Sequence, residues 1–382
     1  MNSYFGNFKE KKSNQRQSNL EVLRIISMVL IVAHHYSVHG GFDSFINTIG
    51  VNFNKSLLEF LGYGGKLGVN LFILISSYFL IESKFSFNKL KKLFITVTFY
   101  SISIYLIFLI FDFKLLNAKE IIRTCLPIFY NSWWFVTRYI LLYLFIDYLN
   151  LFIKNLTKKK LENLIIALIM IQSILPNFFL MRMLQNTELN WFILLYLIGS
   201  YIRLYLMEHY ANNFFIKNSL ILGITIYLFS FLSGIIFDYM GQFFPFFIGK
   251  YYYFAGLYSP TMLFCSVFLF IGFLRLNIQY NFILNYIGAS TFIIYLIHDN
   301  KLIKNFLWIR LLKNYKYCTS KFLIIHSTIS IIIVFIICSI IGIFYNKYIE
   351  NILVEKVNKF LESFNKIINF ILLKKVRKYL RK

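Results

Sequence analysis

The first strongly apolar segment of the chain, residues 20–38, carries ionisable side chains whose spacing could support chemistry. Glu21 and Arg24 are three residues apart, and His35 follows Arg24 by eleven. At 3.6 residues per turn these side chains share one helical stripe, whereas His34 lies off it. A neutral imidazole can accept a proton, and a guanidinium keeps its charge and grips phosphate or carboxylate. The pattern predicts a catalytic group of His35, Arg24 and Glu21.

Two further apolar segments place polar and aromatic side chains at the same depth as His35. The sequence NSWWFVTRY begins one of them and IIYLIHDN ends the other. Trp133 and Trp134 are typical either of an interfacial aromatic belt or of a platform that stacks on a sugar ring. Arg138 lies inside an apolar segment, where a charge is costly and indicates function. We predict an acceptor-binding site made of Trp133, Trp134, Arg138, His298 and Asp299.

A pair of lysines begins the third apolar segment. Lys89 and Lys92 are three residues apart, so they face the same way on a helix, with Lys91 on the adjacent face. Basic residues at this place are typical of the cytoplasmic end of a membrane helix. They are equally suited to hold phosphate groups. The sequence leaves both interpretations open. We predict a cofactor-binding site formed by Lys89, Lys92 and Arg24.

The elements that must position these residues are membrane-spanning helices. Of 382 residues, 58% are hydrophobic and only 15% are charged, which excludes a soluble chain. A net charge of +24 would indicate nucleic-acid binding in a soluble protein, but here it accompanies long apolar segments. A spanning helix needs roughly 20 apolar residues. We therefore expect an all-α bundle of about ten transmembrane helices, near residues 20–38, 67–82, 93–111, 133–153, 163–181, 189–207, 219–237, 256–274, 282–298 and 322–344.

The distribution of Lys and Arg predicts how the chain is oriented. These residues are more frequent in the segments that face the cytoplasm if the N-terminus does, so both termini are expected to be cytoplasmic. The chain then divides into an N-terminal tail (1–19) leading into an uncleaved signal anchor, a ten-span domain (20–344) and a basic tail (345–382). The loop 299–321 is basic although it would lie outside. Either it attracts an anionic lipid or glycan, or the last two spans differ from this prediction.

The C-terminal tail has a helical pattern of apolar residues with Lys and Arg between them. Such a pattern predicts an amphipathic helix on the anionic inner leaflet, which makes anionic lipids expected partners. A solvated helical tail is the alternative. The apolar positions are Leu353, Val357, Phe360, Leu361, Phe364, Ile367, Ile368 and Ile371.

In these segments the chain resembles acyltransferase family 3, integral membrane proteins that transfer acetyl and related acyl groups to bacterial surface carbohydrates. The family hallmark, an Arg followed by ten residues and a His in the first span, matches Arg24 and His35. The segments NLEVLRIISMVLIVAHHYSVHGG, GVNLFILISSYFLIES, WWF, LYLIGSYIR and YLIHDN follow the family in order, over roughly residues 18–345. Lys89 and Lys92 stand where the family mostly has Arg, and Ser77 where it usually has Gly.

The resemblance implies a bundle of ten spans without the extracytoplasmic esterase-like domain that some members append. The donor would be a cytoplasmic acyl-CoA, usually acetyl-CoA, and the acceptor a hydroxyl of a surface polysaccharide or lipid-linked glycan. The protein would lie in the bacterial cytoplasmic membrane, and no metal or nucleic acid is expected. Coenzyme A would dock at Lys89, Lys92 and Arg24, and its thin arm would span the roughly 16 Å to His35.

The sequence leaves the role of His35 and one alternative function open. His35 could act as a general base or carry the acyl group covalently; we prefer the base, because an acyl-imidazole hydrolyses easily at a wet face. Glu21 is expected to orient Arg24. The alternative function is a transporter or flippase of lipid-linked sugars, which predicts helices broken by paired Gly or Pro near mid-membrane. A glycan polymerase would be expected to have a larger outer loop. The four cysteines give neither a disulfide framework nor a metal spacing, and oligomeric state stays open.

Overall fold

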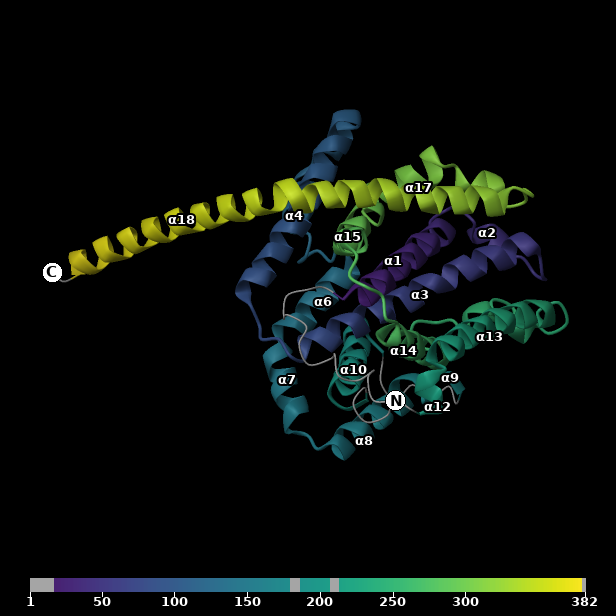
Figure 1. Ribbon diagram of the computed structural model, residues 1–382. Helices are drawn as coiled ribbons and strands as arrows, with labels where there is room; N and C mark the ends of the chain where they lie inside the picture. Colours follow the sequence, from purple (N-terminus) through teal and green to yellow (C-terminus); the bar gives the residue numbers. More distant parts are fainter. Residues whose placement is uncertain (1–16, 179–185, 207–212, 380–382) are drawn as a thin grey trace.

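The computed structural model describes residues 17–178, 186–206 and 213–379, with side chains described up to residue 363 and at residue 366. Every regular element in these ranges is helical, which confirms the all-α prediction (Figure 1). The longer helices are α1 (Ser18–Val38), α3 (Phe53–Leu80), α4 (Phe87–Phe111), α6 (Trp134–Leu144), α7 (Ile146–Asn155), α8 (Lys158–Ile169), α10 (Glu188–Tyr201), α13 (Ser219–Met240), α14 (Pro260–Arg275), α15 (Phe282–His298), α17 (Leu323–Phe344) and α18 (Glu350–Tyr379). The short ones are α2 (Asp43–Ile46), α5 (Ala118–Cys125), α9 (Leu175–Phe178), α12 (Phe214–Lys217) and α16 (Lys301–Asn305). Single π-helical turns follow α8, α10, α16 and α17, at Met170–Ile174, Ile202–Leu206, Phe306–Leu311 and Tyr345–Ile349.

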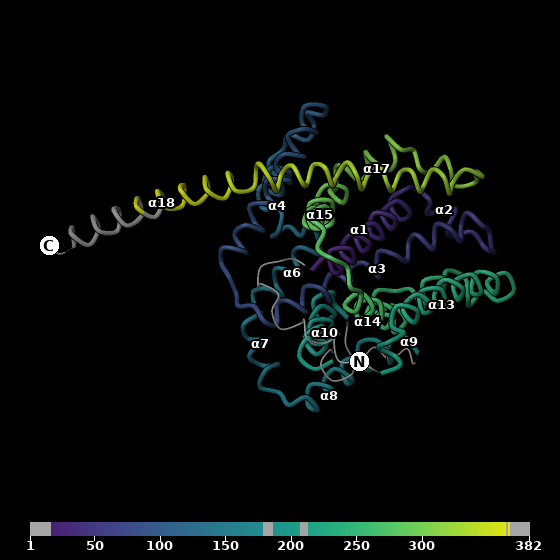
Figure 2. Tube along the Cα trace, viewed as in Figure 1, coloured from purple at the N-terminus to yellow at the C-terminus, as the bar shows by residue number. Residues whose placement is uncertain are grey.

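Helices α1 and α3 form the centre of the bundle, and α15 packs against α1 (Figures 1 and 2). Glycines on α3 allow the close approach. A Cβ added to Gly68 would lie 2.6 Å from the Ser27 carbonyl oxygen and 2.9 Å from the Ile31 side chain, and one added to Gly65 would collide with the His34 ring. The contact therefore depends on the missing side chains, which lets the backbones of the two helices meet.

We expect Gly68→Ala to destabilise the protein. Alanine favours a helix over glycine by up to about 1 kcal/mol, but overpacking costs about 1–3 kcal/mol. The overpacking should win, because the added methyl meets the Ser27 carbonyl oxygen, a backbone atom that cannot turn away. Thermal unfolding of the detergent-solubilised protein measures the effect. Gly256→Ala is the control, since its Cβ would come no closer than 3.6 Å to the Tyr252 carbonyl oxygen. Equal midpoints for the two variants would contradict the packing argument.

Buried polar contacts fix the neighbouring helices to α3. The Lys55 ammonium lies 3.0 Å from the Asp238 carboxylate and joins α3 to α13. The Trp191 indole donates to the Asn70 side-chain oxygen at 2.8 Å and joins α10 to α3. Ser77, where the resembled family usually has Gly, donates to the Ile73 and Leu74 carbonyls of its own helix. Ser77 packs directly against Gly199 of α10. The small residue at this helix contact is therefore on α10 rather than on α3.

The length and composition of the helices make this a multi-pass membrane protein. Among the described residues, seven helices are long and apolar enough to cross a membrane, and nine if each bent pair is one span. The bent pairs are α6 with α7, at 57°, and α15 with the segment Lys301–Tyr317, at 72°. Helix α14 is apolar but shorter, and it lies where the eighth span was expected. The count of ten and the cytoplasmic position of both termini stay predictions.

Two expected boundaries were wrong. Helix α3 begins at Phe53 rather than near residue 67, because Lys55, Glu59 and Lys66 interrupt the hydropathy pattern; Lys55 and Glu59 are nonetheless buried inside the protein. The segment 299–321, expected as a loop, forms α16, a π-helical turn and the short helix Asn314–Tyr317. The helical part of this segment, Lys301–Tyr317, comes directly after the 72° bend at the end of α15.

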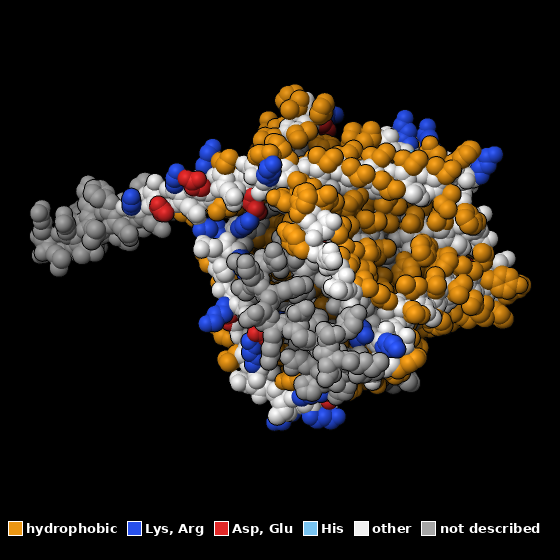
Figure 3. Space-filling model, viewed as in Figure 1, with side chains coloured by type: hydrophobic (Ala, Val, Ile, Leu, Met, Phe, Trp, Pro, Cys, Tyr) orange, Lys and Arg blue, Asp and Glu red, His pale blue; other side chains and the backbone are white. Residues whose placement is uncertain are grey.

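The outer surface of the bundle is apolar where lipid would cover it. Apolar side chains form a broad continuous area over the face shown in Figure 3, with Lys and Arg mostly at its margins. Large apolar side chains are exposed along α17 and α13, among them Ile329, Ile333, Ile337, Leu228 and Leu232. Exposed apolar area on this scale is suited to hydrocarbon rather than to water.

The C-terminal tail continues the last span without a break in the helix. From α17 the chain passes through the turn at Tyr345–Ile349 into α18, which extends away from the bundle (Figure 1). Leu353 and Val357 are half-buried, while Phe360 and Leu361 are exposed. The side chains of Phe364, Ile367, Ile368 and Ile371 lie outside the described residues, as do residues 1–16 of the N-terminal tail. Binding of α18 to the inner leaflet and the division into three segments stay predictions.

Candidate active site

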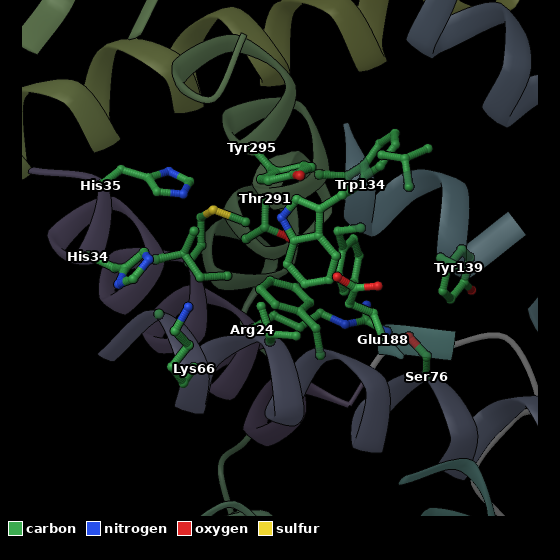
Figure 4. A pocket seen from close by; sticks show the side chains of 18 of the residues that line it. Arg24, His34, His35, Lys66, Ser76, Trp134, Tyr139, Glu188, Thr291 and Tyr295 are labelled. Atoms are coloured by element: carbon green, nitrogen blue, oxygen red, sulfur yellow. The ribbon is translucent and has the colours of Figure 1, made fainter. Parts of the chain in front are cut away.

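A cavity of about 620 Å³ lies between α1, α3, α6 and α15 (Figure 4). Its lining includes Arg24, Met28, Ile31, His34 and His35 of α1, Lys66, Val69, Phe72 and Ser76 of α3, Trp134 and Tyr139 of α6, Thr291 and Tyr295 of α15, and Glu188 of α10. Arg24 and His35 are about three helical turns apart, so the cavity follows α1 over that length. Most of its wall is apolar, and charges inside it interact more strongly than they would in water.

His35 is held by a chain of hydrogen bonds that fixes its tautomer. The Nδ1 atom of His35 lies 2.9 Å from Nε2 of His298, whose own Nδ1 lies 2.5 Å from the Ile294 carbonyl oxygen. A carbonyl only accepts, so Nδ1 of a neutral His298 carries the proton and its Nε2 accepts. Nδ1 of His35 must then donate. A neutral His35 is left with a lone pair on Nε2, as a general base requires.

A carboxylate stands near the free nitrogen of His35. Asp299 Oδ1 lies 3.7 Å from His35 Nε2 and 2.9 Å from the Lys304 ammonium. The His39 ring follows, with its centroid 5.1 Å from that of His35. Burial lowers the pKa of His39 to about 4, and the Lys304 ammonium acts in the same direction. His39 is therefore uncharged at neutral pH, and Asp299 is the anion nearest to a proton gained by His35.

The same groups could be read as ligands of a metal ion. His35, His39 and Asp299 offer three ligand atoms within 4.8 Å of one another. Ligand atoms around tetrahedral zinc are about 3.3 Å apart, from bonds of about 2.0 Å. To bind zinc, the three ligand atoms would have to move closer together. Asp299 would lose its ion pair with Lys304, and His35 would lose the hydrogen bond that fixes its tautomer. Their present contacts fit a hydrogen-bonded network that orients His35.

Arg24 lines the cavity, and its charge is partly neutralised by Glu21, which lies outside the lining. Its guanidinium donates to Glu21 Oε1 at 2.8 Å, and the Glu21 carboxylate is buried between α1 and α15. Gly288 of α15 leaves the space that this carboxylate fills, since an added Cβ there would collide with it. Glu21 thus lies outside the cavity lining and contacts two residues of that lining, Arg24 and Gly288.

Lys89 and Lys92 line a second cavity of about 220 Å³. This cavity shares Leu93, Ala289 and Phe292 with the main one, so the two are neighbours separated by common walls. Lys92 is paired with Glu350 at the start of α18, at 2.6 Å. The predicted lysine site is therefore next to the main cavity but apart from Arg24.

The predicted acceptor residues occupy different positions around the cavity. Trp134 lies on its wall, whereas Trp133 is buried, 2% exposed, and lies outside the lining. Arg138 pairs with Glu188 at 3.4 Å, and Glu188 is the partner that faces the cavity. His298 and Asp299 lie outside the lining and approach His35, at 2.9 Å and 3.7 Å.

Sequence reasoning missed several residues of this wall, and two of them, His34 and Lys66, are basic. His34 was placed off the stripe, yet it lines the cavity while its Nδ1 bonds the Gly62 carbonyl of α3. Lys66 was assigned to a loop, because the expected second span began at residue 67. Its position inside an apolar, glycine-rich helix was the signal that could have identified it.

Comparison with known protein families matches residues 17–345 to the acyltransferase domain of family 3. No curated protein and no solved structure matches the chain. The matched range contains every residue that lines the main cavity and ends where α17 passes into the π-helical turn. It leaves α18 outside.

Proposed function

Because this chain belongs to acyltransferase family 3, we propose that it moves an acetyl or similar acyl group from a cytoplasmic acyl-CoA to a hydroxyl of an extracytoplasmic or lipid-linked carbohydrate. The observation that carries the proposal is the main cavity, which has Arg24 near one end of α1 and His35 near the other. We place the protein in the bacterial cytoplasmic membrane.

The donor is proposed to enter from the side of Lys89 and Lys92. Ammonium groups suit the phosphates of coenzyme A, which are too charged to enter hydrocarbon. The pantetheine arm is thin and uncharged, and it would pass Leu93 and Phe292, which both cavities share, to reach Arg24. From there the thioester extends along α1 toward His35. The route keeps the nucleotide on the cytoplasmic side while the acyl group meets an acceptor near the outer end of α1.

The acceptor hydroxyl is proposed to be activated by His35. Nε2 takes the proton of the hydroxyl, whose oxygen attacks the thioester carbonyl. The Asp299 carboxylate, 3.7 Å from Nε2, stabilises the imidazolium that results. Trp134 offers an aromatic face for the sugar ring, and the Arg138 and Glu188 pair offers polar contacts at the wall. No step of this route uses a metal ion.

We expect Lys89→Ala combined with Lys92→Ala to lower the affinity for acyl-CoA. A hydrogen bond between charged groups contributes about 1.5–3 kcal/mol, and both lysines are partly exposed, so the loss should be about tenfold or more. Equilibrium binding of acetyl-CoA to the protein in nanodiscs measures it. The loss should shrink at high ionic strength, because salt screens exposed charges.

Two further variants sharpen the test of the lysines. Lys84→Ala removes an exposed charge just before α4 and should leave the affinity unchanged. Glu350→Gln frees Lys92 from its 2.6 Å ion pair and should raise the affinity. If the double variant binds acetyl-CoA as the wild type does, these lysines set topology only.

A test of the proposed function must separate an acyltransferase from a transporter of lipid-linked sugars, because a transporter would share the bent helices α6–α7 and α15–α16. The test uses the surface polysaccharide of the host. In a strain that lacks the protein, alkali-labile acetyl esters should disappear from the polysaccharide while its amount stays constant. A halt of polysaccharide export with esters retained on the remaining chains would reject the acyltransferase in favour of the transporter.

A further inference from the structure

Lys66 projects from α3 into the main cavity as an unneutralised cation. Among the residues that the structure describes, its ammonium has neither a hydrogen-bond acceptor nor an ion-pair partner. Figure 4 shows Lys66 on the same side of the cavity as His34 and His35. The close packing of α3 on α1 at Gly65, directly against the His34 ring, brings it there.

The other cations around the cavity have counter-charges. Arg24 pairs with Glu21 at 2.8 Å, Lys304 with Asp299 at 2.9 Å, and Arg138 with Glu188 at 3.4 Å. A half-buried ammonium without such a partner opposes folding, because it has lost part of its water and gained no counter-charge in exchange. The charge of Lys66 is thus available to an anion that arises inside the cavity.

We propose that Lys66 is a catalytic residue that stabilises the oxyanion formed on the acyl carbonyl during transfer. This inference rests on the proposed function and adds to it the group that meets the developing negative charge. A fixed charge in an apolar site stabilises such a charge strongly, because it needs no reorganisation as the reaction proceeds.

The surroundings of Lys66 fit a transient oxyanion better than a resident phosphate or carboxylate. Sites for those anions supply several donors, but the nearby wall is built from Met28, Ile31 and Val69. The imidazoles add no donor. Nδ1 of His34 is used by the Gly62 carbonyl, which leaves a lone pair on its Nε2, and His35 likewise presents a lone pair. The lone pair that His34 presents near the ammonium repels a resident anion, whereas a single carbonyl oxygen can approach the ammonium alone.

The electrons and protons of the step balance within the named groups. His35 Nε2 removes the hydroxyl proton as the acceptor oxygen forms a bond to the acyl carbon. The π electrons of the carbonyl move onto its oxygen, beside the Lys66 ammonium. The oxyanion then reforms the carbonyl and breaks the carbon–sulfur bond, and the leaving thiolate takes the proton from the His35 imidazolium. The products are the ester and free coenzyme A, and Lys66 neither gains nor loses a proton.

The test compares Lys66→Met with wild type in nanodiscs, using acetyl-CoA as donor and either water or surface glycan extracted from the host as acceptor. Both reactions pass through the same oxyanion, so kcat should fall about 10²–10³-fold in each. Binding of acetyl-CoA should be unchanged. The thermal midpoint should not fall, because methionine removes an unpaired, half-buried charge at similar volume. Lys66→Arg should retain part of the activity, and Lys250→Met, at an exposed lysine outside both cavities, should behave as wild type.

Each other outcome identifies a different failure. If hydrolysis by water is unaffected and only the KM for the glycan rises, Lys66 binds an acidic group of the acceptor, and the oxyanion role is wrong. Lost activity with a lowered thermal midpoint in both Lys66 variants would make the residue structural and would also overturn the proposal. If wild type itself transfers nothing from acetyl-CoA, the proposed function has failed, independently of Lys66.

Discussion

His35→Gln is expected to slow acyl transfer about 10²–10⁴-fold, the range for losing a general base. Glutamine has nearly the reach of histidine and can keep a hydrogen bond to His298, but it has no basic lone pair to take the hydroxyl proton. The binding of acetyl-CoA should change little, because His35 lies at the end of α1 opposite to Arg24. The measurement is transfer of labelled acetyl from acetyl-CoA to the extracted host glycan, with binding measured in parallel.

His326→Gln is the matched control for His35. His326 bonds the Tyr36 hydroxyl at 2.8 Å and stacks on Tyr317, away from the cavity. Its replacement should leave kcat at the wild-type value. Full activity in His35→Gln would reject the base. Pre-steady-state release of coenzyme A without the glycan separates the two roles of His35, since a covalent acyl carrier would give a burst equal to the amount of protein and a base would give none.

Arg24→Ala is expected to abolish transfer and to destabilise the protein. Removing one partner of a buried ion pair costs about 3–5 kcal/mol. Arg24 is 24% exposed, which places the loss at or below the lower end of that range. Glu21 would remain as a buried carboxylate. Combining Arg24→Met with Glu21→Gln removes both charges, so it should recover the thermal midpoint but not the activity. Such a result would show that the charge of Arg24 is needed to bind the donor, whereas its ion pair with Glu21 stabilises the fold.

Arg123→Ala provides the control for Arg24. Arg123 and Glu120 have the same spacing along α5, at 3.1 Å, but their side chains are more exposed, at 39% and 32%. An exposed pair contributes about 0–1 kcal/mol, so the thermal midpoint and transfer should stay close to wild type. Recovery of activity in the double variant at Arg24 and Glu21 would show that Arg24 serves only to neutralise Glu21.

The stripe of α1 could be predicted because it depends on one helix alone. The helical repeat places Arg24 and His35 on one side whatever surrounds them, and both line the main cavity. The exclusion of His34 failed for the complementary reason. A cavity between several helices covers a wider arc than a stripe, so the neighbouring face of α1 reaches it as well.

The network around His35 could be predicted only in part. The sequence placed His298 and Asp299 at the same depth as His35, but not in contact with it. The hydrogen bond between His35 and His298 joins residues 263 apart, and it depends on how α15 crosses α1. Trp133 shows the same limit. It adjoins Trp134 in sequence, yet it lies in the core while Trp134 faces the cavity.

The amino-acid sequence by itself determined that this protein is a helical membrane bundle, because apolar length and helical repeat are properties of single segments. It also determined the Arg24 and His35 pair on α1. The tertiary structure alone decided which nitrogen of His35 is free, which cations are neutralised, and that Lys66 has no counter-charge among the described residues. These features depend on contacts between helices that are far apart in the chain. The packing of those helices decides whether a charge has a partner, and the sequence of a single segment does not predict that packing.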